Sequence, residues 1–398
     1  MITLDIICSD YRMINGANRV TEKLVLGYKR FAQNGIKLRY LYTTDGVVDC
    51  KKYVSPLGDY SKNYLKKRKI VEKLKKLPFY KLYPIQAYMQ IRTNNVAEIS
   101  VKRYMKDNNY ADCIIFQDVY AAFFMIKKYG VPENTKTMVI THVDTDPMEQ
   151  MLINRPQLRN TKAEQYIRSR YNYAIENVDK VISICHSSQN YIKKTNNVDA
   201  ECILNGIEDI PCSKKKLNNG RVNVVVLGSV IYRKGQDILV DAIAKLDKKY
   251  QEKLLLHIIG KGNNFDLIKK SISEKGLTNC CKIYGEISDV STILSQMDVM
   301  FLPSRSDTVP IAIIEGLRAG LPVFSTSFGE IPYMIEGCGV IIEPTVERVY
   351  QALTDIMEDR FDLIGMSHRA RKRYLDVFTL NSMIDKYSEC IKSLYKKN

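Results

Sequence analysis

Short apolar runs alternate with amphipathic stretches along most of the chain. This alternation is typical of parallel β-sheets whose strands are joined by crossover helices, so we predict an α/β protein. A polar segment at residues 207–221 (IEDIPCSKKKLNNGR) interrupts the pattern and is interpreted as a linker between two similar units. The runs predict strands at residues 4–8, 38–42, 113–116, 138–141 and 180–184, and then at 223–227, 254–259, 280–284, 299–302 and 321–325.

The length of the chain supports a division into two domains. A chain of 398 residues exceeds what one hydrophobic core usually serves. We therefore expect a first domain over residues 1–207 and a second over residues 208–379. The remaining residues, 380–398, carry apolar positions at helical spacing and are expected to form a helix that packs against another element.

Open α/β sheets bind ligands at the carboxyl ends of their strands, so the loops there are the first places to search. In the second unit three such loops stand out: GSVIYRKG at 228–235, GKGNN at 260–264 and PSRSDTVP at 303–310. We expect all three to contribute to one ligand site.

The loop at 303–310 leads into a short predicted helix, 311–319, bounded by a proline and a glycine. Glu315 falls beside the apolar stripe of this helix, where a carboxylate needs hydrogen-bond donors. One interpretation directs Glu315 and Asp307 to the hydroxyls of a ribose or hexose, which carboxylates bind well. The alternative makes Asp307 or Thr308 a helix cap and Glu315 a buried acid with internal partners.

The loop at 228–235 places two cations, Arg233 and Lys234, just before a predicted helix. Small residues allow close backbone approach, and cations beside a helix start suit a diphosphate. The alternative is an ordinary surface pair, because basic residues precede many helices.

Composition excludes several other classes of protein. No apolar run approaches the roughly 20 residues that span a bilayer, and the first residues lack the pattern of a signal peptide, so a cytoplasmic location is expected. The ten cysteines include no CxxC pair, which argues against a zinc site and against a disulfide framework. We expect them to be reduced residues of the core.

The net charge of +16 is concentrated in one region. Residues 51–110 contain 15 Lys and Arg against 4 Asp and Glu. Within them, the basic segment at residues 62–84 has apolar residues at helical spacing, a pattern suited to anionic lipid headgroups. A lysine-rich solvated helix is the plain alternative, and nucleic-acid binding is disfavoured because no recognition motif accompanies the charge. The candidate membrane or acceptor surface comprises Lys66, Lys67, Arg68, Lys69 and Lys73.

The order of motifs in the second half resembles the nucleotide-binding domain of family 4 retaining glycosyltransferases, the glycosyl transferases group 1 type. The shared features, from about residue 184 to 344, are the NG at 205–206, the G-x5-KG loop, the GKG turn, YGEISD, DVMFLPS, the acid-x7-Glu pair and GLPVFST. The resemblance implies a GT-B fold, in which two Rossmann-like domains have parallel sheets facing a central cleft. It also implies that the helix at 380–398 crosses back onto the first domain.

By that resemblance, the second domain would bind the donor. Lys234 would bind the donor diphosphate, with Arg233 as an additional cation, and Glu315 would accept hydrogen bonds from the ribose. Asp307 and the backbone after it, at Thr308 and Val309, would hold the donor sugar.

In the first domain the resemblance rests on two loops. Gly16, in MINGANRV, would lie close to the phosphates, and His142, in VITHVD, would approach the anomeric centre. His142 also has a plain interpretation as a polar residue at the end of a strand.

The implied reaction is transfer of a hexose from a nucleotide diphosphate, with UDP favoured, to an acceptor hydroxyl with retention at the anomeric carbon. The resemblance implies a lipid-linked or cell-surface polysaccharide precursor as acceptor, a peripheral position on the cytoplasmic membrane face, and no metal or cofactor besides the nucleotide-sugar. A nucleotide-sugar epimerase or hydrolase, which can share the GT-B architecture, is one alternative. Two departures from the family pattern, Asp307 in place of the usual glutamate and Ser229 in place of arginine, motivate a second alternative, a non-catalytic protein that binds a sugar nucleotide or a partner.

Overall fold

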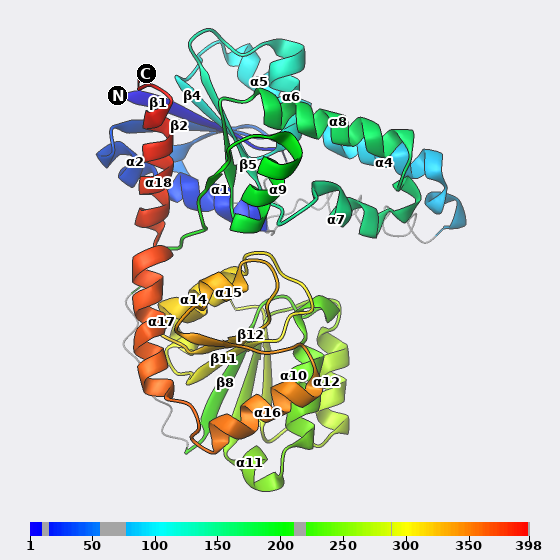
Figure 1. Ribbon diagram of the computed structural model, residues 1–398, viewed down its shortest axis with the longest axis vertical. Helices are drawn as coiled ribbons and strands as arrows, with labels where there is room; N and C mark the ends of the chain where they lie inside the picture. Colours follow the sequence, from blue (N-terminus) through cyan, green and yellow to red (C-terminus); the bar gives the residue numbers. More distant parts are fainter. Residues whose placement is uncertain (10–15, 56–76, 211–219, 288, 397–398) are drawn as a thin grey trace. The chain divides into compact units, whose positions relative to one another are not determined.

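The computed structural model describes residues 1–9, 16–55, 77–210, 220–287 and 289–396 (Figure 1). The chain divides into two compact units. Unit 1 comprises Met1–Leu204 and Met383–Asn398, and unit 2 comprises Asn205–Ser382. The five predicted membrane-surface residues, Lys66, Lys67, Arg68, Lys69 and Lys73, lie outside the described residues.

Unit 1 is built on a seven-stranded sheet in which neighbouring strands are parallel except at the β2–β3 edge. Every residue of the central strand Cys113–Phe116 is buried, as expected for a parallel sheet covered by helices on both faces. The strand order is β3 (Val47–Asp49), β2 (Ile36–Tyr42), β1 (Ile2–Ile7), β4 (Cys113–Phe116), β5 (Lys136–Thr141), β6 (Lys180–Ser183) and β7 (Glu201–Cys202).

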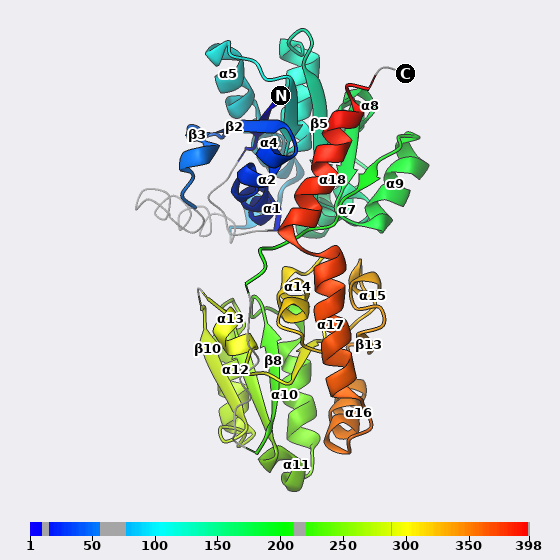
Figure 2. The ribbon, with the colours of Figure 1, turned by 90° about the vertical axis from the view of Figure 1, so that its left-hand side faces the viewer.

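Helices from both ends of the chain pack on this sheet. The last helix, α18 (Leu380–Ser393), lies beside the first two (Figure 2). Arg30 donates hydrogen bonds of 2.7 and 2.6 Å to Asp385, and a Cβ added to Gly27 would lie 2.5 Å from Ile384. The other helices of unit 1 are α1 (Gly16–Leu26), α2 (Tyr28–Gln33), α4 (Tyr83–Asn95), α5 (Glu98–Asp107), α6 (Val119–Phe124), α7 (Pro147–Asn154), α8 (Lys162–Asn177) and α9 (His186–Asn196).

Unit 2 has the same kind of architecture as unit 1 and is built on a six-stranded parallel sheet. Its strand order is β10 (Cys281–Gly285), β9 (Leu254–Ile259), β8 (Val222–Leu227), β11 (Val299–Leu302), β12 (Val323–Ser325) and β13 (Gly339–Ile341). The helices are α10 (Gln236–Lys245), α11 (Lys248–Glu252), α12 (Phe265–Glu274), α13 (Ser291–Leu294), α14 (Ile311–Arg318), α15 (Ile331–Met334), α16 (Val346–Met357) and α17 (Leu363–Val377). Helices cover both faces of the sheet in each unit (Figure 1).

Each of the ten predicted apolar runs overlaps a strand, so the α/β prediction is confirmed. The pattern missed β3, β7 and β13, which are two or three residues long and have no fully buried residue. Such short, half-exposed strands leave no apolar run for a sequence pattern to detect.

Candidate functional site

The loops at the carboxyl edge of the unit 2 sheet are packed backbone to backbone. The amide of Val230 donates a hydrogen bond of 3.1 Å to the carbonyl of Lys261. A Cβ on Gly262 would lie 2.3 Å from the carbonyl oxygen of Val230. The loop at 228–235 and the turn at 260–264 therefore fit together only because glycine stands at this contact.

Gly235 allows a similar close backbone contact between two other loops. It has φ +73°, and a Cβ there would lie 2.0 Å from the carbonyl oxygen of Pro303. The amide of Arg305 donates a hydrogen bond of 2.7 Å to the carbonyl of Arg233. The G-x5-KG loop is thus held directly against the loop at 303–310.

This contact brings Lys234 and Asp307 together. The ammonium of Lys234 donates a hydrogen bond to Oδ2 of Asp307, and the two side chains are 12% and 9% exposed. Ser304 Oγ donates to the same carboxylate oxygen at 3.3 Å. Burial lowers the pKa of Lys234 from its usual value, and the negative charge of Asp307 opposes that shift.

Arg233 adds a second cation on the outer side of the pair. Its Nη1 lies 3.2 Å from Asp307 Oδ1 and 2.6 Å from the carbonyl oxygen of Ser306. One carboxylate thus faces two cations, so this group of three side chains carries a net positive charge. An anionic ligand group would be stabilised there.

The sequence interpretation missed Arg305 and its partners. Arg305 forms two hydrogen bonds with Asp237, at 2.8 and 2.6 Å, and donates another of 2.6 Å to the carbonyl of Tyr232. Its guanidinium carbon lies 3.9 Å from the centroid of the Tyr232 ring. These contacts fasten the loop that carries Lys234 to the loop that carries Asp307. No sequence signal links Arg305 with Asp237, because 68 residues separate them.

The residues after Asp307 lead into α14. Thr308 accepts a hydrogen bond of 2.8 Å from the amide of Glu330 through its carbonyl, and Val309 and Glu315 are half-buried. No side chain caps α14, whose N-cap is Pro310. The hypothesis that Asp307 or Thr308 is a helix cap is therefore wrong.

In unit 1, His142 follows β5 at the carboxyl edge of the sheet. Its Nε2 lies 2.9 Å from Oε1 of Gln117, which follows the neighbouring strand β4. Burial lowers the pKa of His142 to about 4, so the imidazole is neutral at pH 7. Nδ1 of His142 and Nε2 of Gln117 are buried and have no hydrogen-bond partner in the described part of the chain. Gly16 is the first residue of α1.

The sequence interpretation also left Gln117 unassigned, along with its neighbour Asp118. Asp118 accepts hydrogen bonds from Ser9 Oγ and, at 2.8 Å, from the amide of Tyr120, which makes it the cap of α6. Burial raises the pKa of Asp118. Both residues come directly after a strand, which is the signal that would have identified them.

Two aspartates follow His142 at residues 144–146 (DTD), and the second of them, Asp146, has a structural role. Asp146 caps α7 through a 2.9 Å hydrogen bond from the amide of Met148. It also accepts hydrogen bonds of 2.9 and 3.0 Å from Arg168. Both carboxylate oxygens of Asp146 therefore have hydrogen-bond donors.

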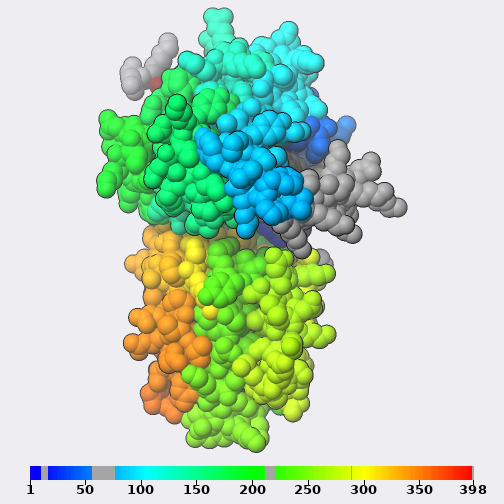
Figure 3. Space-filling model, turned by 90° about the vertical axis from the view of Figure 1, so that its right-hand side faces the viewer, coloured from blue at the N-terminus to red at the C-terminus, as the bar shows by residue number. Residues whose placement is uncertain are grey.

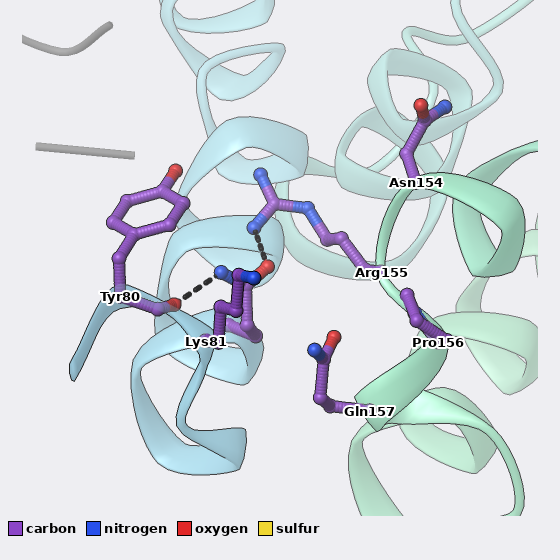
Figure 4. A pocket seen from close by; sticks show the side chains of 7 residues that line it. Tyr80, Lys81, Asn154, Arg155, Pro156 and Gln157 are labelled. Carbon is purple, nitrogen blue, oxygen red and sulfur yellow. Dashed lines mark hydrogen bonds between the residues drawn. The ribbon is translucent and has the colours of Figure 1, made fainter. Parts of the chain in front are cut away.

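Unit 1 also carries a pocket away from the strand ends (Figure 4). It lies between the start of α4 and the turn after α7 and has a volume of about 530 Å³. Figure 3 shows the blue start of α4 and the neighbouring green segment at the molecular surface. The lining residues are Tyr80, Lys81, Gln86, Asn154, Arg155, Pro156 and Gln157.

Comparison with known proteins finds similarity to glycosyltransferases in the second half of the chain. Residues 212–374 match the family Glycosyl transferases group 1. Lipopolysaccharide glucosyltransferase WaaG of Escherichia coli is 26% identical over 196 residues, which cover 46% of this chain and 51% of WaaG. An uncharacterized glycosyltransferase of Methanocaldococcus jannaschii is 27% identical over 168 residues, 41% of this chain and 45% of that protein. The chain thus spans about half the length of the curated relatives it matches.

Solved structures extend the likeness to the whole chain. The crystal structure of WaaG has a TM-score of 0.65 and 17% identity, with 98% of this chain and 99% of WaaG covered. HepE of Anabaena, solved with UDP, has a TM-score of 0.66 and 14% identity over 99% of this chain and 100% of HepE. The fold is GT-B.

None of the described helices is long and apolar enough to cross a membrane.

Proposed function

We propose that this protein is a retaining glycosyltransferase that moves a hexose from a nucleotide diphosphate donor, a UDP-sugar, to an acceptor hydroxyl. The observation that carries the proposal is the cluster of Lys234, Arg233 and Asp307 at the carboxyl edge of the unit 2 sheet. It lies within the part of the chain that matches the glycosyl transferases group 1 family. The UDP in the HepE structure supports the choice of nucleotide.

The chemistry of the step fits this cluster. As the bond between the anomeric carbon and the phosphate breaks, negative charge accumulates on the leaving diphosphate. Lys234 and Arg233, fixed by their neighbours, would stabilise that charge as it grows in the transition state. The proposal includes no metal ion and no cofactor.

Retention is proposed to follow a front-face course. In this scheme the leaving phosphate accepts the proton of the acceptor hydroxyl while the new glycosidic bond forms on the same face of the sugar. No carboxylate nucleophile is assigned, so the protein's part is to hold both substrates in the reacting geometry and to stabilise the diphosphate.

The remaining site residues are assigned to the parts of the donor. Glu315 would accept hydrogen bonds from the ribose hydroxyls, and Asp307 with the backbone at Thr308 and Val309 would hold the sugar. Gly16 would allow the phosphates a close approach. His142, neutral at pH 7, would contact the sugar through hydrogen bonds and would not act as a cation.

The acceptor is proposed to be a lipid-linked or cell-surface polysaccharide precursor at the cytoplasmic membrane face. Several relatives carry names from O-antigen and lipopolysaccharide synthesis, which supports a glycan acceptor. Phe79, Leu82 and Tyr83 are 49%, 57% and 39% exposed beside Lys81, an arrangement suited to a membrane interface.

A panel of nucleotide-sugars tests the proposal. Thermal unfolding should shift upward strongly for one donor, and that donor should then support transfer to a glycan or lipid-linked acceptor. Donor turnover without any acceptor would favour the epimerase or hydrolase. Binding without turnover across a broad acceptor screen would favour the non-catalytic alternative, and no stabilisation by any nucleotide would refute all three.

A further inference from the structure

We propose that the pocket of unit 1 at the start of α4 binds a phosphate ester of a sugar or polyol. Its volume of about 530 Å³ falls in the range of roughly 300–1,000 Å³ that small-molecule sites occupy. Unit 1 alone forms it, so the proposal does not depend on the transferase reaction assigned to the strand-end loops.

The charge of the lining points to an anion. Lys81 and Arg155 line the pocket, and no acidic residue from the described part of the chain does. Neither cation forms an ion pair with any described residue, whereas Arg159, four positions further on, donates hydrogen bonds of 2.9 Å each to both carboxylate oxygens of Glu149. The pocket therefore keeps a positive charge that a ligand can neutralise.

A buried amide holds the guanidinium in place. Gln86 is 4% exposed, and its Oε1 accepts a hydrogen bond of 2.6 Å from Nη1 of Arg155. Its Nε2 donates to the carbonyl of Tyr80, so both ends of the amide are engaged (Figure 4). Because Gln86 is neutral, it orients Arg155 without compensating its positive charge. An acidic partner would have formed a structural ion pair and cancelled that charge.

The two walls of the pocket indicate the class of anion. Tyr80 and Lys81 come from the segment before α4, while Asn154 ends α7 and Arg155 and Gln157 belong to the turn that follows it (Figure 4). Cations from both walls suit the two negative charges of a phosphate monoester. The amide group of Gln157 can donate to and accept from the hydroxyls of a sugar or polyol.

Titration of the full-length protein with glucose 6-phosphate tests this proposal, with glucose as the neutral control. We expect glucose 6-phosphate to bind and glucose at the same concentration not to bind. Arg155→Gln and Lys81→Gln should each weaken binding about tenfold, the usual effect of one charge-assisted contact. Gln86→Leu should weaken it in the same direction while the net charge stays constant.

Two matched variants make the result specific. Arg159→Gln removes the same charge from the same turn, and Lys234→Ala removes the cation of the unit 2 cluster, so both should leave the affinity for glucose 6-phosphate unchanged. Loss of binding in Lys234→Ala but not in Arg155→Gln would overturn the proposal, because it would place the ligand in unit 2. Equal effects of Arg155→Gln and Arg159→Gln would also overturn it, as would no binding by the wild type.

Binding of the protein to lipid vesicles distinguishes a free phosphate ester from a lipid headgroup as the ligand. Vesicles of phosphatidylglycerol that displace glucose 6-phosphate, and whose retention of the protein falls in Arg155→Gln, would assign the phosphate to a lipid. Vesicles that bind all variants equally and displace nothing would assign it to a free sugar or polyol phosphate.

Discussion

The ammonium of Lys234 and the carboxylate of Asp307 form a hydrogen-bonded, largely buried ion pair at the carboxyl edge of the unit 2 sheet. The two groups that were expected to serve different parts of a nucleotide-sugar are thus bound to each other. Under the proposed function, the donor diphosphate would compete with Asp307 for Lys234. The carboxylate would therefore influence nucleotide affinity as well as any contact it makes with the sugar.

Asp307→Asn is expected to bind UDP more tightly, by about tenfold, because it frees Lys234 and removes a negative charge beside the diphosphate. Transfer should fall in the same variant if Asp307 holds the sugar. Calorimetric titration with UDP and an activity assay measure the two effects separately. Asp359→Asn removes an equal charge from an exposed turn and should leave UDP affinity unchanged; an equal gain in both variants would contradict the local role of Asp307.

Glu315→Ala is expected to weaken UDP binding by about tenfold or more, because a charged hydrogen bond to the ribose is lost. Titration with 2′-deoxy-UDP and 3′-deoxy-UDP gives the matched control. The deoxy nucleotide that lacks the contacted hydroxyl should bind equally well to the wild type and to Glu315→Ala. If the variant weakens UDP and both deoxy nucleotides by the same factor, Glu315 acts on the fold of α14 and not on the ribose.

Gln117→Glu is expected to raise the pKa of His142 from its lowered value of about 4, because a carboxylate beside Nε2 favours the imidazolium. Nuclear magnetic resonance titration of the histidine side chains measures this shift directly. His257 lies in unit 2 and serves as an internal control whose titration should not change. Identical titration of His142 in both proteins would show that Gln117 does not contact it in solution.

His257 is expected to make the stability of unit 2 depend on pH. It sits in β9, where its ring nitrogens lie 2.9 Å from the Tyr284 hydroxyl and 3.3 Å from Asn223 Oδ1. Burial lowers its pKa from 6.5 to about 4, so the unfolded chain takes up the proton first. Its stabilising contribution is complete above pH 6.5 and is lost as the pH falls towards 4.

Urea unfolding of the wild type and of His257→Gln at a series of pH values isolates this effect, since the carboxylates titrate equally in both. Between pH 6.5 and 4 the free energy of unfolding of the wild type should fall more steeply, by up to about 1.4 kcal/mol per pH unit. Parallel pH profiles for the two proteins would mean that His257 stays accessible to protons in the folded state.

Vesicles that contain anionic lipid are expected to retain the protein at low salt and to release it at high salt. Neutralising Lys66, Lys67, Arg68 and Lys69 should abolish most of this retention. Neutralising four exposed lysines of unit 2, Lys248, Lys249, Lys253 and Lys269, changes the net charge equally and should have a small effect. If both sets reduce retention alike, only the total charge matters and the basic segment has no special role.

The sequence predicted those parts of the fold and site that depend on local patterns. Buried parallel strands appear as apolar runs, and Lys234 and Asp307 could be found because motifs occur in a recognisable order along unit 2. The pairing of Arg305 with Asp237 and of His142 with Gln117 could not, because 68 and 25 residues separate the partners and each side chain is unremarkable alone. The pocket around Arg155 escaped prediction for the same reason, since its two walls come from distant segments.

The packing of α18 beside Gly27 has a consequence for how the protein is made. Unit 2 is one continuous stretch, Asn205–Ser382, whereas unit 1 needs residues from both ends of the chain. During synthesis, the first stretch of unit 1 emerges before unit 2 but cannot complete its packing around Ile384 and Asp385 until α18 has also been made. The half that is translated first is therefore the half that finishes folding last.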